Sequence, residues 1–70
     1  MTGYEFYRKI RKLGQREGVP VNLVGEHGKG SHGRLYYGDA FTTMKDRRKE
    51  IGPGLVRKMC RDLGVDPQDL

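Results

Sequence analysis

The stretch RLYYGDAFTTM, residues 34–44, decides the fold of this 70-residue chain. Two runs rich in aromatic, apolar and β-branched residues lie on either side of Gly38-Asp39, which has the composition of a two-residue hairpin turn. Glycine adopts the positive φ that such a turn requires without a steric penalty. The pattern predicts two antiparallel strands, residues 34–37 and 40–44, joined by a tight turn.

The first of these strands has two chemically different faces. Side chains alternate across a strand, so His32, Arg34 and Tyr36 are expected on one face. Leu35 and Tyr37 are expected on the other face, and Leu35 belongs with the core. The face that carries His32 and Arg34 is therefore predicted to be open to solvent or to a partner.

A helix and a further strand are predicted upstream. Thr2 and Glu5 form a capping-box pattern, and a narrow apolar stripe follows at helical spacing, made of Phe6, Ile10 and Leu13. Gly18 is expected to end this helix. Residues 19–26 are rich in β-branched residues and predict a strand, with Pro20 at an edge or outside the ladder.

A second helix is predicted downstream. Residues 45–50 form a polar, strongly charged loop, after which Pro53 suits the first turn of a helix and Gly64 suits its end. Residues 66–70 allow one short further turn of helix. The apolar face of the second helix is expected in the core, and it consists of Leu55, Val56, Met59, Cys60 and Leu63.

The predicted order is helix, three strands, helix, in a single domain of residues 1–70. Each helix has one apolar stripe to bury, so both are expected on one face of a three-stranded antiparallel sheet, which makes an α+β fold. A chain of this length buries only about 60% of its unfolded surface, so its core is small. The other face of the sheet is left to solvent or to a partner.

The charge of the chain indicates a polyanionic partner. Lys and Arg number 14 against 9 Asp and Glu, for a formal net charge of +5 and a pI of about 9.7. The cations are clustered, which favours nucleic acid over charge that serves solubility alone. The clusters are Arg8, Lys9, Arg11 and Lys12; Lys29 and Arg34; Lys45, Arg47, Arg48 and Lys49; and Arg57, Lys58 and Arg61.

Several classes of protein are disfavoured. The chain has no apolar run long enough for a membrane span or a signal peptide. One cysteine, Cys60, excludes an intramolecular disulfide and fits a reducing cytoplasm. One cysteine and two histidines in a loop do not supply a tetrahedral zinc site. We therefore predict a cytoplasmic protein without a metal or other cofactor.

The glycine-rich segment HGKGSHG, residues 27–33, matches two nucleotide-binding motifs only in part. It fits G-x-G-x-x-G, but a strand follows it where a dinucleotide-binding fold requires a helix. It is also not a P-loop, because Lys29 is followed by Gly30 before Ser31. A local phosphate contact from Lys29 and backbone N–H groups remains open.

The same segment delivers His32 to the open face of the predicted sheet, where its chemistry suits RNA cleavage. An imidazole takes a proton from a 2′-hydroxyl, or gives one to the leaving 5′-oxygen, near neutral pH. Arg34 and Lys29 are placed to stabilise charge on the phosphate, and Tyr36 to stack on a base. The alternative is that His32 is only a polar loop residue, as we assume for His27.

The arrangement of these motifs resembles the HicA toxin family over nearly the whole chain. Gly30-Ser31-His32 precedes the second predicted strand, and Thr42-Thr43 lies in the third. The sequence Gly-Pro-Gly-Leu-Val-Arg-Lys-Met, residues 52–59, opens the second helix. The chain differs from many members at Gly33, where they carry a histidine or an apolar residue, and in its shorter turn at Gly38-Asp39. Glycine at position 33 is expected to let the backbone move.

The resemblance implies a fold like that of a double-stranded RNA-binding domain. It implies metal-independent cleavage of messenger RNA by the toxin of a type II toxin–antitoxin system, with His32 as the catalytic histidine. It also implies a HicB-type antitoxin that covers this histidine. Residues 45–49 are expected to bind RNA or, equally, to form the docking site of the antitoxin. The predicted RNA-binding residues are Lys29, Gly30, Ser31, Arg34, Tyr36, Lys45, Arg47 and Arg48.

Two other functions compete with a ribonuclease. A non-catalytic RNA-binding module of the same fold would use every one of these basic residues and would differ only at His32. A DNA-binding repressor is the weakest hypothesis, because the sheet separates the two helices and no helix-turn-helix spacing is present.

Overall fold

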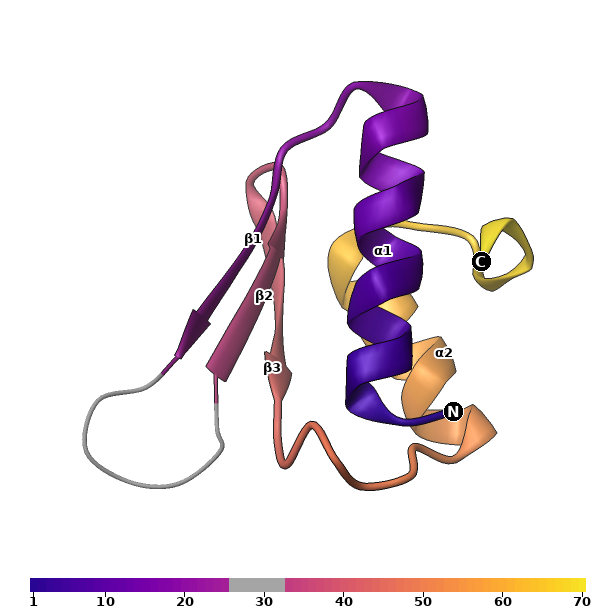
Figure 1. Ribbon diagram of the computed structural model, residues 1–70. Helices are drawn as coiled ribbons and strands as arrows, with labels where there is room; N and C mark the ends of the chain where they lie inside the picture. Colours follow the sequence, from indigo (N-terminus) through magenta and orange to yellow (C-terminus); the bar gives the residue numbers. More distant parts are fainter. Residues whose placement is uncertain (26–32) are drawn as a thin grey trace.

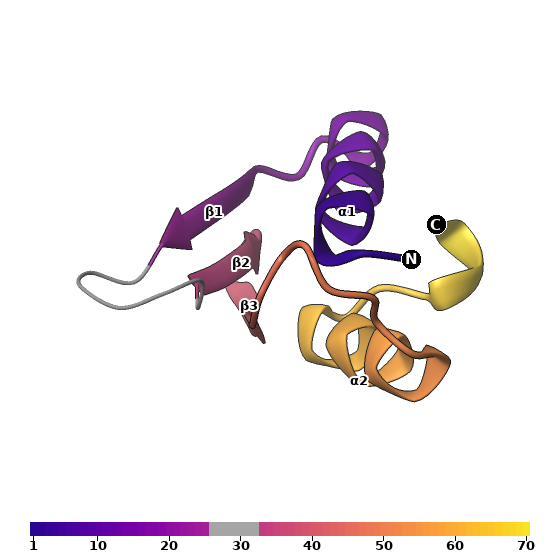
Figure 2. The same cartoon turned by 60° about the horizontal axis from the view of Figure 1, so that its bottom comes forward.

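A computed structural model describes residues 1–25 and 33–70, and it confirms the predicted order of elements. Helix α1 (Gly3–Glu17) is followed by strands β1 (Val21–Gly25), β2 (Gly33–Tyr37) and β3 (Ala40–Met44), and then by helix α2 (Pro53–Leu63) (Figure 1). A short 3-10 helix, η1 (Pro67–Asp69), follows α2. The sheet is antiparallel in the order β1-β2-β3. Both helices cover the same face of it, as Figure 2 shows.

The core lies between the inner face of the sheet and the two helices. Leu35 at the middle of β2 is fully buried, and its register partners are Leu23 in β1 and Thr42 in β3. Alternation along β2 is as predicted, because Leu35 is buried while Arg34 beside it is exposed. The buried cluster draws on both helices and the sheet, and consists of Phe6, Ile10, Leu35, Met44, Ile51, Met59, Cys60 and Leu63.

The turn between β2 and β3 has the predicted two residues. Gly38 has a φ of +62°, and Asp39 has no positive φ, which is the sign pattern of a type II′ hairpin turn. The Gly38 N–H donates a hydrogen bond of 2.8 Å to the carbonyl oxygen of Pro20. Pro20 precedes β1 and stays outside the ladder, so the strand predicted at residues 19–26 begins only at Val21.

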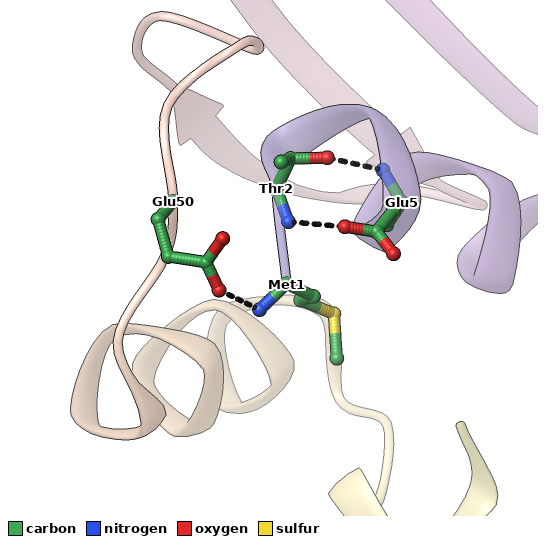
Figure 3. Close-up of polar contacts among 4 residues, drawn as sticks. All are labelled: Met1, Thr2, Glu5 and Glu50. Carbon is green, nitrogen blue, oxygen red and sulfur yellow. Dashed lines mark hydrogen bonds and ion pairs between the residues drawn. The ribbon is translucent and has the colours of Figure 1, made fainter.

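Helix α1 begins with the predicted capping box. The Thr2 Oγ1 accepts from the Glu5 backbone N–H at 3.2 Å, and the Thr2 N–H donates to Glu5 Oε1 at 2.8 Å (Figure 3). The hydrogen bond from the Thr2 backbone N–H, with a further contribution from the Thr2 side chain, holds the pKa of the Glu5 carboxyl below its ordinary value. The capping box therefore satisfies two of the donors at the start of α1, the N–H groups of Thr2 and Glu5.

The charged loop between β3 and α2 completes the start of α1. The carbonyl oxygens of Lys49 and Arg47 accept from the N–H groups of Gly3 and Tyr4, at 3.3 and 3.0 Å. The Met1 amino group donates to the Glu50 carboxylate on the same loop (Figure 3). The loop was predicted as a polar connection whose cations contact RNA or an antitoxin; its backbone is in addition part of the scaffold that holds α1.

Helix α2 is anchored to β3 by a shared carboxylate. Thr42 is 2% exposed, and its hydroxyl donates to Asp62 Oδ2 at 2.9 Å. Lys58 Nζ, one turn earlier in α2, donates to the same oxygen at 2.8 Å. The bond from Lys58, followed by that from Thr42, lowers the pKa of Asp62. The buried hydroxyl of Thr42 is thus satisfied, as a polar group in a core must be.

One residue predicted in the core is outside it. Leu55 is 45% exposed, whereas Met59, Cys60 and Leu63 on the same helix are buried as predicted, and Val56 is half-buried. Leu55 lies in the first turn of α2, at the end of the apolar stripe, and no other element of residues 1–25 and 33–70 covers it. It instead borders a groove of about 410 Å³ that Met44, Ile51 and Met59 also line.

Helix α1 approaches the start of β1 so closely that Gly14 is required there. A Cβ atom at Gly14 would lie 2.5 Å from Val21 Cγ2 and 2.6 Å from the carbonyl oxygen of Val19. Gly54, in α2, has open space at the same position. Gly14 and Gly54 therefore differ in the space available to a Cβ atom.

We expect Gly14→Ala to lower the free energy of unfolding by about 1–3 kcal/mol, because the methyl group meets backbone that cannot move aside. Helix propensity alone would favour alanine by up to about 1 kcal/mol. Gly54→Ala is the matched control, and its stability should equal or slightly exceed that of the wild type. Urea unfolding followed by circular dichroism compares the two; a Gly14→Ala protein as stable as Gly54→Ala would contradict this account of the packing.

The anchor at Asp62 predicts a pH dependence of stability. The folded-state pKa of Asp62 lies below the ordinary aspartate value of 3.8, so its contribution is complete above that value and is lost as the pH falls through the folded pKa. Asp62→Asn keeps an oxygen that accepts from Thr42 but removes the charge. The free energy of unfolding, measured from pH 6 to pH 2, should therefore fall more in the wild type than in Asp62→Asn. If the free energies of unfolding of the two proteins fell equally with pH, the Asp62 charge would contribute nothing to stability.

Candidate nucleic-acid interface

The face of the sheet opposite the helices is uncovered by any element of the described chain (Figures 1 and 2). Its side chains occupy the positions that alternate with the buried residues of β2 and β3 and with the half-buried residues of β1. We call this surface the outer sheet face, and it consists of Asn22, Val24, Arg34, Tyr36, Phe41 and Thr43. These positions include one cation and no carboxylate, which suits a negatively charged partner.

Three of these side chains form one continuous patch. Tyr36 and Phe41 are register partners on adjacent strands, with ring centroids 5.6 Å apart and ring planes inclined by 40°. The guanidinium carbon of Arg34 lies 4.9 Å from the centroid of the Phe41 ring, within the range of a cation–π contact. Two aromatic rings and a planar cation thus lie together on a surface open to solvent.

The structure places Arg34 and Tyr36 on the open face, as the sequence predicts. Phe41 was not recognised as part of the site, although it is 43% exposed. The signal was present in the sequence, because a two-residue turn at positions 38 and 39 pairs residue 36 with residue 41. Residues 40–44 were predicted as a strand, but its outward-facing and inward-facing side chains were not distinguished.

Four predicted site residues lie in residues 26–32, outside the described part of the chain: Lys29, Gly30, Ser31 and His32. The residues on either side of this segment are described. Gly25 and Gly33 are register partners, and Gly33 also pairs with Met44 in β3. The two residues that flank the segment, Gly25 and Gly33, are therefore held in the sheet.

Gly33 does not have the role expected of it. It is buried and paired with strands on both sides, so its backbone is fixed in the sheet at the start of β2. A Cβ atom here would lie 2.7 Å from the carbonyl oxygen of Val24. The glycine is needed because β1 and β2 approach closely at this end of the sheet.

The three cations predicted in the loop after β3 differ in their surroundings. Lys45 is exposed and follows Met44, the register partner of Gly33, so it lies at the end of the sheet where β2 begins. Arg48 is exposed but bonded through its backbone N–H and Nε to Asp46 Oδ1, at 3.0 and 3.4 Å. The hydrogen bond from the Arg48 backbone is the main cause that lowers the pKa of Asp46. Arg47 is half-buried where the loop holds α1. Lys45 is therefore the best placed of the three to meet a phosphate.

A second basic surface lies on α1, which packs on the opposite side of the sheet. A groove of about 600 Å³ separates this helix from the C-terminal segment, where Asp69 and Leu70 border it. The cations along the groove are Arg8, Lys9, Lys12 and Arg16. The sequence left open whether this helix face binds phosphate or is only solvated, and the groove gives it a concave shape.

The described residues offer little other chemistry. Within residues 1–25 and 33–70, no three His, Cys, Asp or Glu side chains are grouped so that they could hold a metal ion. Burial raises the pKa of the Cys60 thiol, with a smaller contribution from Asp66, which leaves the cysteine protonated and poorly reactive. No helix in this part of the chain is long and apolar enough to cross a membrane.

No protein-family model, curated protein or solved structure matches the chain. Membership of the HicA family consequently stays a prediction from the motifs of the sequence.

Proposed function

We propose that this protein binds RNA on the outer sheet face and cleaves it, with His32 as general acid or base. The observation that carries the proposal is the position of β2. This strand begins at the residue after His32 and presents Arg34 and Tyr36 on an open, carboxylate-free surface. A guanidinium and an aromatic ring on such a surface are the groups that bind a phosphate and a base.

The proposed reaction uses the 2′-hydroxyl of the RNA as the nucleophile. In one form, His32 takes the hydroxyl proton as the 2′-oxygen attacks the adjacent phosphorus, and water protonates the leaving 5′-oxygen. In the other, water takes the hydroxyl proton and His32 protonates the 5′-oxygen as the P–O bond to it breaks. The products are a 2′,3′-cyclic phosphate and a free 5′-hydroxyl. Arg34 stabilises the negative charge that gathers on the phosphate oxygens, and Lys29 does the same from the glycine-rich segment.

The same proposal includes the biological setting that the HicA resemblance implies. The substrate would be messenger RNA in the cytoplasm, and its cleavage would arrest growth. A HicB-type antitoxin would silence the protein by covering His32. Lys45 and its neighbours in the loop remain shared candidates for contact with RNA or with this antitoxin.

A non-catalytic RNA-binding module is the second candidate. It is favoured by the fact that the aromatic patch, Lys45 and the groove on α1 lie in elements that do not include His32. Such a module would hold RNA with the same residues but would leave it intact. Only the chemistry of His32 distinguishes the two candidates.

We expect His32→Ala to reduce RNA cleavage by about 10²- to 10⁴-fold, the usual contribution of a general acid or base. His27→Ala is the matched control, since it removes the other histidine of the same segment and should retain activity. Both variants should bind RNA as the wild type does. Purified proteins are incubated with labelled RNA, and growth is followed after induction in bacteria. Cleavage that survives in His32→Ala would refute the mechanism; an inactive, well-folded wild type would favour the binding module.

We also expect RNA binding to weaken steeply with salt. About three to five phosphate contacts on a single strand give a slope of about −2 to −3.5 for log K against log salt concentration. Lys45→Ala should reduce the magnitude of this slope by about 0.7. Arg57→Ala, which removes an exposed cation from α2, is the control and should leave it unchanged. Fluorescence anisotropy with His32→Ala protein measures these slopes, and a flat dependence would contradict binding through phosphates.

A further inference from the structure

We infer that the outer sheet face is a base-stacking platform that selects single-stranded RNA, with Phe41 as its principal stacking residue. The inference rests on the proposed function and adds to it the class of RNA that is bound. It is carried by the patch of Arg34, Tyr36 and Phe41 on a sheet face that nothing in the described chain covers.

The exposure of Phe41 is the first step. A domain of this size has few large apolar side chains with which to build a core, and burying one phenylalanine stabilises a fold by about 1.5–3 kcal/mol. Phe41 is nevertheless 43% exposed, and Val24, on the same face, is 53% exposed. Tyr36 is the register partner of Phe41, lies beside it and extends the aromatic surface.

The contacts within the patch prepare it for planar ligands. The guanidinium carbon of Arg34 lies over the Phe41 ring, 4.9 Å from its centroid, so the cation and the ring are in contact. A base that reaches this surface finds two aromatic rings and a planar guanidinium, each of which stacks on any of the four bases. Stacking of this kind tolerates sequence changes, because every base has a π-face.

This surface suits a single strand better than a duplex. In duplex RNA the bases are stacked on one another, and the helix presents mainly phosphates and 2′-hydroxyls to a protein. Those polar groups match Lys or Arg, whereas Val24 and Phe41 offer them no hydrogen bond and Tyr36 offers only its hydroxyl. Unpaired bases are free to lie on the rings.

The positions of Arg34 and Lys45 indicate where the phosphate backbone of a bound RNA would lie. Tyr36 and Phe41 lie nearer the hairpin turn, while Arg34 lies toward the beginning of β2 and Lys45 follows β3 at that same end. The distance along the strand from Tyr36 to the start of β2 is about 10 Å, at about 3.3 Å per residue. Arg34 and Lys45 are therefore placed to meet the phosphates of a strand whose bases stack on the platform and which runs toward the end of the sheet where cleavage is proposed.

The test uses tryptophan fluorescence. The chain contains no tryptophan, so Phe41→Trp in a His32→Ala background places a single reporter on the platform of a protein that does not cleave. A single-stranded 12-nucleotide RNA should quench this fluorescence on binding, and the 12-base-pair duplex of the same sequence should not. Phe41→Ala should weaken binding of the single strand by about 5- to 150-fold, the range for the loss of one stacked base.

Leu55→Ala is the matched control for lost apolar surface. Leu55 is 45% exposed, close to the value for Phe41, but belongs to α2 and borders a different groove. Binding by this variant should equal that of the parent protein. Phe41→Tyr should retain the affinity because it keeps the ring. Thermal unfolding of each variant shows whether the fold is intact, as the exposure of both residues leads us to expect.

The outcomes separate the platform from the proposed ribonuclease. Tighter binding of the duplex, an unquenched tryptophan, or equal affinities for Phe41→Ala and Leu55→Ala would overturn the platform, even if His32-dependent cleavage is found. Quenching and stacking without cleavage by the wild type would support the platform and refute the enzyme. Failure to bind either RNA would overturn both and favour a protein partner for this face.

Discussion

Leu35 occupies the middle of the central strand, and its burial in the core shared by α1 and α2 fixes the orientation of every other residue in the sheet. Because side chains alternate, burying Leu35 turns Arg34 and Tyr36 outward, and pairing with β3 turns Phe41 outward beside them. A shift of one residue would expose the core and bury a guanidinium. The chemistry of the outer sheet face is thus a consequence of how the core is filled.

The connection between β3 and α2 illustrates a different constraint, the need to satisfy the N–H groups that begin a helix. Residues 45–50 carry a dense run of charge, which directs attention to their side chains. Their carbonyl groups, however, hold the start of α1, and Arg47 is half-buried there. The loop therefore has a structural role in its backbone and leaves only some of its cations, Lys45 among them, for a partner.

The two surfaces suited to RNA are of different kinds and lie on opposite sides of the sheet. The groove on α1 offers several cations and little aromatic surface, which suits phosphates. The outer sheet face offers rings with few charges, which suits bases. Under the proposed function, the groove on α1 would attract RNA broadly by charge, and the outer sheet face would hold unpaired bases by stacking.

The sequence by itself determined the order of elements, the hairpin turn at Gly38-Asp39, the capping box at Thr2 and the outward position of Arg34 and Tyr36. Each of these follows from local rules of φ, capping and alternation that act over a few residues. Tertiary structure alone decided that Leu55 is exposed, that Gly33 and Gly14 are required by close approach, and that residues 45–50 hold α1. These features depend on contacts between segments far apart in the chain, which no local pattern records. The role of His32 rests on the sequence alone, whereas the partnership of Phe41 with Arg34 emerged only when the strands were paired.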